Sequence, residues 1–312
     1  MIEEGFPCIP KGKEVEVRLR SALVLLLAGF FGLAQASGDL GSWAEAHWEA
    51  LVQADVEGLM ATVDPQALVA FWGTPWAGFF VGEGIAQAFS RFFEEYQVEE
   101  AVTTRVHAEA SLVVGEAVLG EGAGLLRIYL QFAEDGKIVA ADYVLVGGEG
   151  VPLVDGAIGE GEYARQVEVA GAKIAWRNGA VVLFVGLSAP GTGWVALGLD
   201  RTGILHQGSH IVIAAVTPEG LWIKQYDGRH PAPFYVPSAR ENRDILDAAG
   251  AVHDGWTTVE FVIPLDRRDQ GYRPLLPGQA YEALVAYHRT SKELRKHTDI
   301  GVFWIELAGP TQ

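Results

Sequence analysis

The sequence predicts two unlike parts: an α+β cone in the N-terminal half and an all-β, immunoglobulin-like sandwich in the C-terminal half. In the first half, apolar residues at helical spacing precede four strand-like runs, an order typical of α+β folds. In the second half, short apolar runs alternate with Gly, Pro, Asn and Asp, as in β-sandwiches. Charge divides similarly, because residues 37–150 contain 18 acidic and four basic side chains, whereas residues 151–312 contain 18 acidic and 15 basic ones.

The composition limits the partners of the chain. Its 312 residues predict about two domains. A formal net charge of −17 makes phosphate backbones poor partners, so we expect no nucleic-acid binding. One cysteine, Cys8, excludes an internal disulfide and a cysteine-based metal site.

The N-terminus carries the pattern of an export signal. Arg18 and Arg20 precede an apolar run at residues 22–33, and Ala34-Gln35-Ala36 follows it. This order predicts a signal peptide over residues 1–36, cleaved after Ala36, and a periplasmic or secreted protein. The run is shorter than the ~20 residues of a membrane helix, so we expect no stable span after cleavage. An uncleaved anchor and a buried helix are the alternatives.

In the first half, apolar spacing predicts three helices and then an antiparallel meander. Ser42 is the expected N-cap of the first helix, with Glu45 at the capping-box position. Asp135-Gly136 predicts a hairpin turn between the last two strands. The helical residues are Trp43, His47, Leu51 and Val52, then Val56, Leu59, Met60 and Val63, then Ile85, Ala88, Phe89, Phe92 and Phe93. The strands are expected at Ala101–Ala110, Ser111–Gly120, Gly124–Phe132 and Ile138–Val146.

Small motifs over residues 37–148 resemble the SnoaL-like members of the NTF2-like superfamily. They are Trp48 with Asp55–Leu59, Gly78 and Gly82, Ile85 and Phe89, and Asp135–Ile138. The resemblance implies a curved sheet around an apolar pocket, in a domain that is an isomerase, cyclase or hydrolase in some relatives and binds a ligand or dimerises in others. His107, Asp142 and Tyr143 are candidate polar pocket residues, and an Asp–His pair is suited to acid–base chemistry. Ordinary strand positions are the alternative for His107 and Asp142. A linker is expected at 149–155.

In the second half, turn residues separate eight apolar runs that predict strands. Asn178-Gly179 marks a tight hairpin, and Ser238–Ala249 is the one helical candidate. The predicted strands are Lys173–Trp176, Ala180–Leu187, Gly193–Gly198, His210–Val216, Gly220–Tyr226, Thr257–Ile263, Tyr281–Tyr287 and Gly301–Leu307.

Four motifs in order over residues 156–309 resemble the DOMON family. They are Gly193–Gly198 (GWVALG), Gly208–Ile213 (GSHIVI), Asp254–Leu265 (DGWTTVEFVIPL), and Pro277-Gly278 before a late strand, with His297 and Gly301 closing the region. The resemblance implies a sandwich that binds haem b or a sugar.

The resemblance also implies where haem ligands would lie. Cytochrome-type members have a methionine four residues before the Asp of their G-[SA]-D motif, and a histidine near the C-terminus supplies the second ligand. Here His210 occupies the Asp position and His206 the methionine position, while the only methionines are Met1 and Met60. The expected iron ligands are therefore His206 and His297. Bis-imidazole ligation suits electron transfer, and the lack of a C-x-x-C-H motif predicts non-covalent haem b.

Other assignments of these residues stay open. His288 is an alternative second ligand, and His206 with His210 could bind a transition metal together with His288 or His297. Surface histidines on a carbohydrate-binding or structural sandwich are the simplest alternative. The expected cofactor walls include Trp194, Trp222, Phe234 and Tyr235, and the expected propionate partners are Arg201, Arg229 and Lys224.

We therefore expect an exported haem b-binding protein that acts in electron transfer or haem and redox sensing, without catalytic turnover of its own. Its partner would be a redox protein or a small ligand, and the NTF2-like part would bind a ligand or form a homodimer. The alternatives are a sugar- or small-ligand-binding module without haem, and an NTF2-like isomerase or hydrolase.

Overall fold

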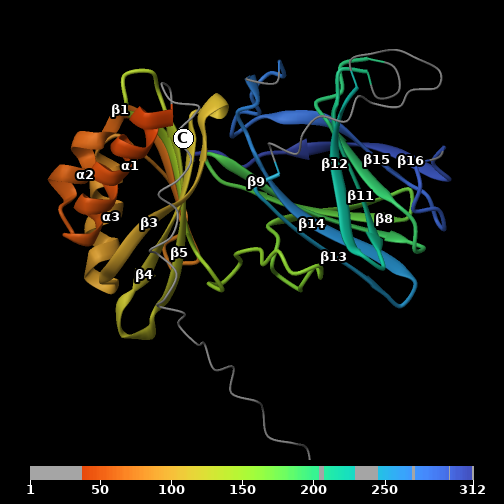
Figure 1. Ribbon diagram of the computed structural model, residues 1–312, viewed down its shortest axis with the longest axis horizontal. Helices are drawn as coiled ribbons and strands as arrows, with labels where there is room; N and C mark the ends of the chain where they lie inside the picture. The colour runs from red at the N-terminus through yellow and green to blue at the C-terminus, as the bar shows by residue number, and fades with distance from the viewer. Residues whose placement is uncertain (1–36, 204–206, 229–244, 269–270, 295, 311–312) are drawn as a thin grey trace, which may run out of the picture. The chain divides into compact units, whose positions relative to one another are not determined.

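The computed structural model describes residues 37–203, 207–228, 245–268, 271–294 and 296–310 (Figure 1). The predicted signal peptide, His206, Arg229, Phe234 and Tyr235 lie outside these ranges. Residues 35–312 form one compact unit. Within the described ranges, no helix is both long and apolar enough to cross a bilayer.

Three helices cover one face of a sheet in the N-terminal half (Figure 1). All three were expected, but the predicted cap at Ser42 is wrong, because the first helix begins at Ser37 and Ser42 lies inside it. The Ser42 hydroxyl instead donates to the Asp39 carbonyl at 2.9 Å. Asp55 caps the second helix by accepting the Gly58 N–H at 3.0 Å. The helices are α1 (Ser37–Val52), α2 (Val56–Thr62) and α3 (Glu83–Glu95).

The first sheet has six strands in the order β2-β1-β6-β5-β4-β3. The four predicted strands form its antiparallel meander, while β1 and β2 were not predicted. Because side chains alternate along a strand, Val69 and Phe71 pack with the helices, and Ala70 faces the opposite side. The strands are β1 (Val63–Trp72), β2 (Gly78–Val81), β3 (Val98–His107), β4 (Leu112–Leu119), β5 (Gly124–Phe132) and β6 (Ile138–Leu145).

The C-terminal half contains two five-stranded antiparallel sheets, in the orders β13-β14-β9-β8-β7 and β12-β11-β10-β15-β16. We name them the inner sheet and the distal sheet. The eight predicted strands are present, and β7 and β13 were missed. The strands are β7 (Arg165–Val169), β8 (Ala172–Asn178), β9 (Val182–Pro190), β10 (Val195–Leu199), β11 (His210–Thr217), β12 (Gly220–Asp227), β13 (Asp247–His253), β14 (Trp256–Pro264), β15 (Ala280–Tyr287) and β16 (Asp299–Glu306).

The helix expected at Ser238–Ala249 is wrong in its described part. Asp247–His253 is strand β13, which pairs with β14 from Asp247↔Val262 to His253↔Trp256. The alanines of this segment favour a helix locally, but ladder hydrogen bonds with a neighbouring strand outweigh that weak propensity.

The two halves share an apolar cluster. Ala70, Tyr129 and Val144 of the first sheet pack with Phe184 and Val262 of the inner sheet. The inner sheet alternates, so that Leu183 and Val185 point to the sandwich core while Phe184 points to the N-terminal half.

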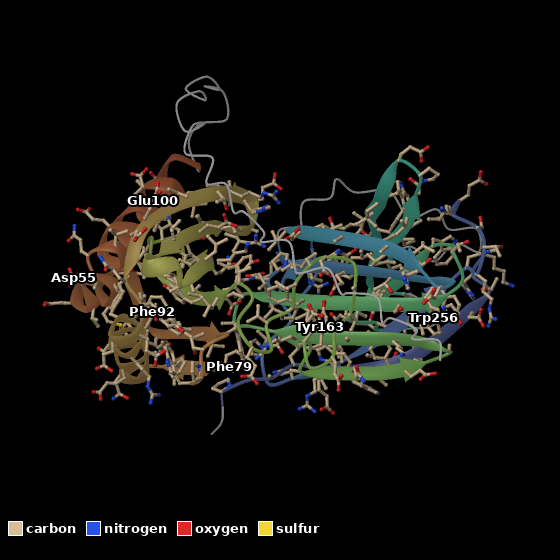
Figure 2. The ribbon with its side chains drawn as sticks, turned by 90° about the horizontal axis from the view of Figure 1, so that it is seen from below. Asp55, Phe79, Phe92, Glu100, Tyr163 and Trp256 are labelled. Atoms are coloured by element: carbon tan, nitrogen blue, oxygen red, sulfur yellow. The ribbon has the colours of Figure 1, made fainter. Side chains whose placement is uncertain are left out.

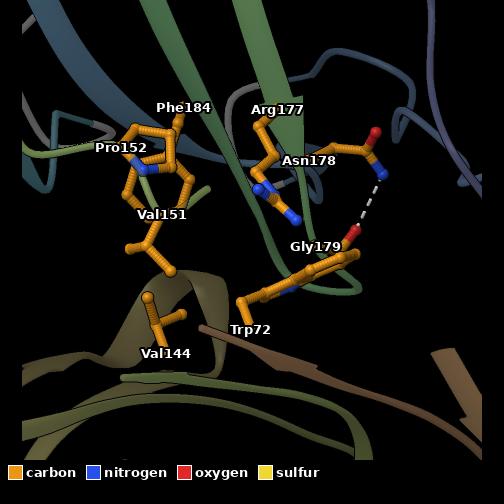
Figure 3. Close-up of a pocket in the computed structure, with 8 residues that line it drawn as sticks. All are labelled: Trp72, Val144, Val151, Pro152, Arg177, Asn178, Gly179 and Phe184. Atoms are coloured by element: carbon orange, nitrogen blue, oxygen red, sulfur yellow. Dashed lines mark hydrogen bonds between the residues drawn. The ribbon is translucent and has the colours of Figure 1, made fainter. Parts of the chain in front are cut away.

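The predicted linker takes part in the same cluster. Val151 and Pro152 are buried beside Trp72 and Phe184 (Figure 3). The Arg177 guanidinium lies over the Trp72 ring, 4.4 Å from its centroid. Residues 149–155 are therefore a packed connection rather than a free tether.

Candidate functional site

The distal sheet has an apolar outer face, which we name the apolar platform. Along β10, Val195 and Leu197 point into the sandwich core, whereas Trp194 and Ala196 belong to a second buried cluster on the other side. In many antiparallel sheets, the face away from the core is polar and solvated, whereas this face is apolar and is already buried within the chain. The platform consists of Trp194, Ala196, Ile211, Ile213, Ala215, Tyr226, Leu284 and Ala286, with Trp222 partly buried against it.

The platform combines small residues with a buried polar atom. The platform includes Ala196, Ala215 and Ala286, whose short side chains leave this part of the sheet flat, as a flat ligand requires. The Trp194 indole N–H is buried, and no acceptor for it is found among the described residues. A buried donor without an acceptor is costly, so this N–H is suited to a polar group of a bound molecule. The two predicted wall residues Trp194 and Trp222 thus lie on one face.

Of the expected propionate partners, Lys224 lies near the platform and Arg201 is already paired. The Lys224 ammonium is 5.6 Å from the centroid of the Trp222 ring. Arg201 forms an ion pair with Glu282.

His210 is buried away from the platform and is held by two neighbours. Its Nδ1 accepts a hydrogen bond from the Arg267 guanidinium at 2.8 Å, and its Nε2 lies 3.1 Å from the Gln225 side-chain amide. Both ring nitrogens of His210 therefore have a side-chain partner within the protein. Arg267 and Gln225, which sequence reasoning missed, make His210 part of a polar network at the start of β11.

His288 is held in a tautomer that does not suit a metal. Its Nδ1 accepts the backbone N–H groups of Thr290 at 3.2 Å and Ser291 at 2.9 Å. The Nε2 of the neutral ring therefore carries the proton. Metal-binding histidines have the opposite pattern, in which the nitrogen remote from the metal donates.

His297 keeps its ring nitrogens free of hydrogen bonds to the described residues and lies half-buried just before β16. Burial and the nearby Lys296 lower its pKa below the usual range, while Asp299 acts in the opposite direction. A lowered pKa keeps the imidazole neutral at pH 7, with a lone pair available to a metal. Thr298 ties this loop to the end of β15 by donating its N–H to the Tyr287 carbonyl at 2.9 Å.

The predicted ligand His297 follows strand β15, and the described residues nearest to the predicted ligand His206 follow strand β10. His206 itself lies outside the described residues, but Thr202 and Gln207 on either side of it are joined at 3.0 Å by a backbone hydrogen bond, between the end of β10 and the start of β11. Strands β10 and β15 are antiparallel, so the loop after β10 and the loop after β15 leave opposite ends. The platform lies between these ends. No group of three metal-ligating side chains is found in the described ranges.

The interior of the N-terminal half contains a hydrogen-bonded chain that the sequence did not reveal. Tyr143 lies 2.5 Å from His47 Nε2, and His47 Nδ1 lies 2.7 Å from the Thr62 hydroxyl, which donates to the Leu59 carbonyl at 2.7 Å. These directions make His47 a neutral Nδ1–H imidazole, and burial lowers its pKa to about 3. Phe71 stacks on Tyr143 with centroids 4.7 Å apart, so aromatic packing surrounds the chain. Figure 2 labels Phe92 in the same core.

The expected acid–base pair of His107 and Asp142 is not formed. Asp142 lies on β6, on the face away from the helices. His107 is the last residue of β3. The register runs from Asp142 through Tyr129 and Val114 to Arg105, so Asp142 lies three strands away from β3. The structure therefore does not bring these two candidate residues together.

Asp142 has a different function, since its carboxylate joins the two halves. It accepts the backbone N–H groups of Ala180 at 2.5 Å, Val181 at 2.8 Å and Val182 at 2.9 Å. Burial raises its pKa to about 6, against the opposite effect of these N–H donors. A Cβ at Gly179 would overlap the carboxylate, which explains the glycine at this turn. Figure 3 labels Gly179 after Asn178.

A second buried carboxylate, Glu260 of β14, holds the connection between the halves. One oxygen accepts the N–H groups of Asp155, Gly156 and Ala157 at 2.8–3.1 Å, and the other accepts the Tyr163 hydroxyl at 2.7 Å. Figure 2 labels Tyr163 beside the strands of the C-terminal half. Burial raises the Glu260 pKa to about 7.

No family model and no curated protein matches the chain. Similar solved structures include cytochrome b domains and SnoaL-like proteins. The cytochrome b domain of pyranose dehydrogenase from Coprinopsis cinerea is 12% identical with a TM-score of 0.34, covering 44% of this chain and 76% of that one. The cytochrome domain of Myriococcum thermophilum cellobiose dehydrogenase is 12% identical with a TM-score of 0.32, covering 45% and 77%. A SnoaL-like protein of unknown function from Burkholderia thailandensis is 14% identical with a TM-score of 0.30, covering 35% and 96%.

Proposed function

We propose that the C-terminal half binds haem b non-covalently on the apolar platform and that the chain serves in electron transfer. The observation that carries the proposal is the platform itself, a buried apolar face with small residues and a buried indole N–H that has no acceptor among the described residues. Haem is flat and apolar with an anionic edge, so these features fit it.

The residues of the chain have separate functions in this proposal. His297, whose pKa is lowered by burial, would hold the haem iron together with His206. His288 is not a ligand, because it accepts hydrogen bonds at Nδ1 and so carries its proton on Nε2, and His210 is not a ligand, because both of its ring nitrogens have side-chain partners. The Trp194 N–H and the Lys224 ammonium bind the propionates. Bound haem supplies a one-electron redox centre, and a redox partner protein supplies or removes the electron.

Haemin titration of the full chain tests the proposal. We expect one equivalent to give the sharp visible bands of a low-spin, six-coordinate haem. His297→Ala should convert these bands to a high-spin spectrum or abolish binding, while His288→Ala should leave them unchanged. The matched control is His253→Ala, since His253 is highly exposed beside Asp254.

Two results would overturn the proposal. A wild-type chain that gives no bands beyond those of free haemin favours the alternative, a small-ligand module without haem. Bands that persist unchanged in both His206→Ala and His297→Ala exclude the ligand pair.

A further inference from the structure

The last strand, β16, is an edge strand with an exposed apolar row. It pairs with β15, and no other strand in the described part of the chain pairs with it (Figure 1). Its side chains alternate, so that Phe303 and Ile305 are buried in the sandwich core. On the outward side, Ile300 is 42% exposed, Val302 46% and Trp304 60%.

This edge lacks the usual features that prevent strand pairing. Soluble proteins protect their edges with charged residues, prolines, bulges or very short strands. The eight residues of β16 pair with β15 without a register shift, and between Asp299 and Glu306 every outward side chain is apolar. An unprotected edge strand with an exposed apolar row can pair with a strand of another chain.

We propose that two copies of this chain pair through β16 in antiparallel orientation, about a two-fold axis at Val302. The row is self-complementary in this register: Ile300 lies opposite the partner's Trp304, Val302 opposite the partner's Val302, and Trp304 opposite the partner's Ile300. A two-fold interface requires such self-complementarity. Aromatic and β-branched pairs across strands are among the stabilising ones.

Charge complementarity at the ends of the row supports a second copy as the occupant. In this register, Glu306 at the end of β16 lies near the partner's segment just before β16, which carries Lys296. Both charged side chains are exposed. The pair would therefore flank the apolar row at each end with opposite charges.

The face of the first sheet opposite its helices is a less suitable dimer surface, because it is already covered. A homodimer through the N-terminal half stays a prediction, but the sheet face opposite its helices is packed against Phe184 and Val262 of the same chain. Strand pairing alone buries less than a standard interface of ~1,600 Å², so we expect a dimer whose population rises with concentration.

Disulfide trapping tests the register. In a Cys8→Ser background, Val302→Cys places two thiols directly opposite across the axis, where paired Cα atoms lie ~4.5–5.5 Å apart, within disulfide reach. Mild oxidation should convert most of the chain to a covalent dimer. The control is Val252→Cys, at a valine 38% exposed on the edge strand β13 of the other sheet, which should stay monomeric.

Sedimentation of the chain without introduced cysteines gives an independent readout. We expect the wild type to approach twice the monomer mass with rising concentration, and Val302→Lys to stay at the monomer mass, because two like charges would lie opposite each other. A wild-type chain that stays monomeric at all concentrations, or equal trapping of Val302→Cys and Val252→Cys, overturns the proposal. Neither experiment depends on haem.

Discussion

Replacing Asp142 with alanine is the sharpest test of how the two halves are joined. The carboxylate accepts the N–H groups of Ala180, Val181 and Val182, all at 2.9 Å or less and all buried. Asp142→Ala leaves the three donors without this acceptor, and each buried unsatisfied group costs about 1–3 kcal/mol. Removing a buried charge offsets part of that loss. At pH 7 we expect the free energy of unfolding to fall by about 3 kcal/mol.

The pH dependence of this difference has a definite sign. The folded-state pKa of Asp142 is raised from 3.8 to about 6 by burial, so between these values the folded chain keeps a proton that the unfolded chain releases. The contribution of this group to stability is therefore fully present below pH 4 and declines by about 3 kcal/mol as pH rises to 6. The destabilisation by Asp142→Ala should accordingly be larger at pH 4 than at pH 7.

Urea unfolding at pH 4, 5, 6 and 7, followed by tryptophan fluorescence, measures both effects. The matched control is Asp64→Ala, since the Asp64 carboxylate accepts a local hydrogen bond from the Gln66 N–H. That variant should lose less than ~1 kcal/mol, as most surface substitutions do. An Asp142→Ala variant that loses less than ~1 kcal/mol at pH 7, or a loss that grows with pH, would refute the reasoning.

Two further predictions use the other buried polar networks. Glu260→Gln should cost less than ~1 kcal/mol, because its carbonyl oxygen can accept the three N–H groups and its amide can donate to Tyr163, whereas Glu260→Ala should cost about 3 kcal/mol. The Glu260 pKa is raised from 4.5 to about 7, so wild-type stability should decline over that range in urea unfolding. Glu260→Gln should keep the decline that Asp142 causes up to pH 6 and lose the further decline between pH 6 and 7. Tyr143→Phe removes the donor to His47 Nε2 and should lower stability by about 1–2 kcal/mol in thermal unfolding, without altering haemin bands. An unchanged melting temperature would contradict this role for the Tyr143 hydroxyl.

The sequence predicted those strands and turns whose pattern lies within one short segment. Gly124–Phe132 is strand β5 with the predicted bounds, and Gly136 has the positive φ of +82° that the Asp135-Gly136 turn requires. Strand β1 was missed because much of it is buried on both faces and it pairs in parallel with β6, which is remote in sequence. Its apolar run therefore lacks the alternation by which strands are recognised.

The candidate site could be predicted only in part. The GWVALG motif indicated Trp194, and the structure places it on the platform. Sequence could not show that Arg267, far along the chain from His210, would lie within hydrogen-bond distance of its Nδ1. Motif spacing likewise gave Asp142 a pocket role, because nothing local indicates that the β8–β9 turn supplies three N–H donors. Long-range partners decide what a buried polar residue does.

The helices and the three sheets in the described part of the chain are stacked so that most sheet faces are covered by a neighbouring layer. The helices cover one face of the first sheet, and the inner sheet covers its other face through Phe184 and Val262. The inner and distal sheets enclose the sandwich core between them. Each of these faces therefore has a described partner layer, whereas the described helices and sheets supply none for the apolar platform. Asp142 and Glu260 fix the layers on the opposite side of the sandwich, whereas the apolar row of β16 stays exposed at the edge of the distal sheet.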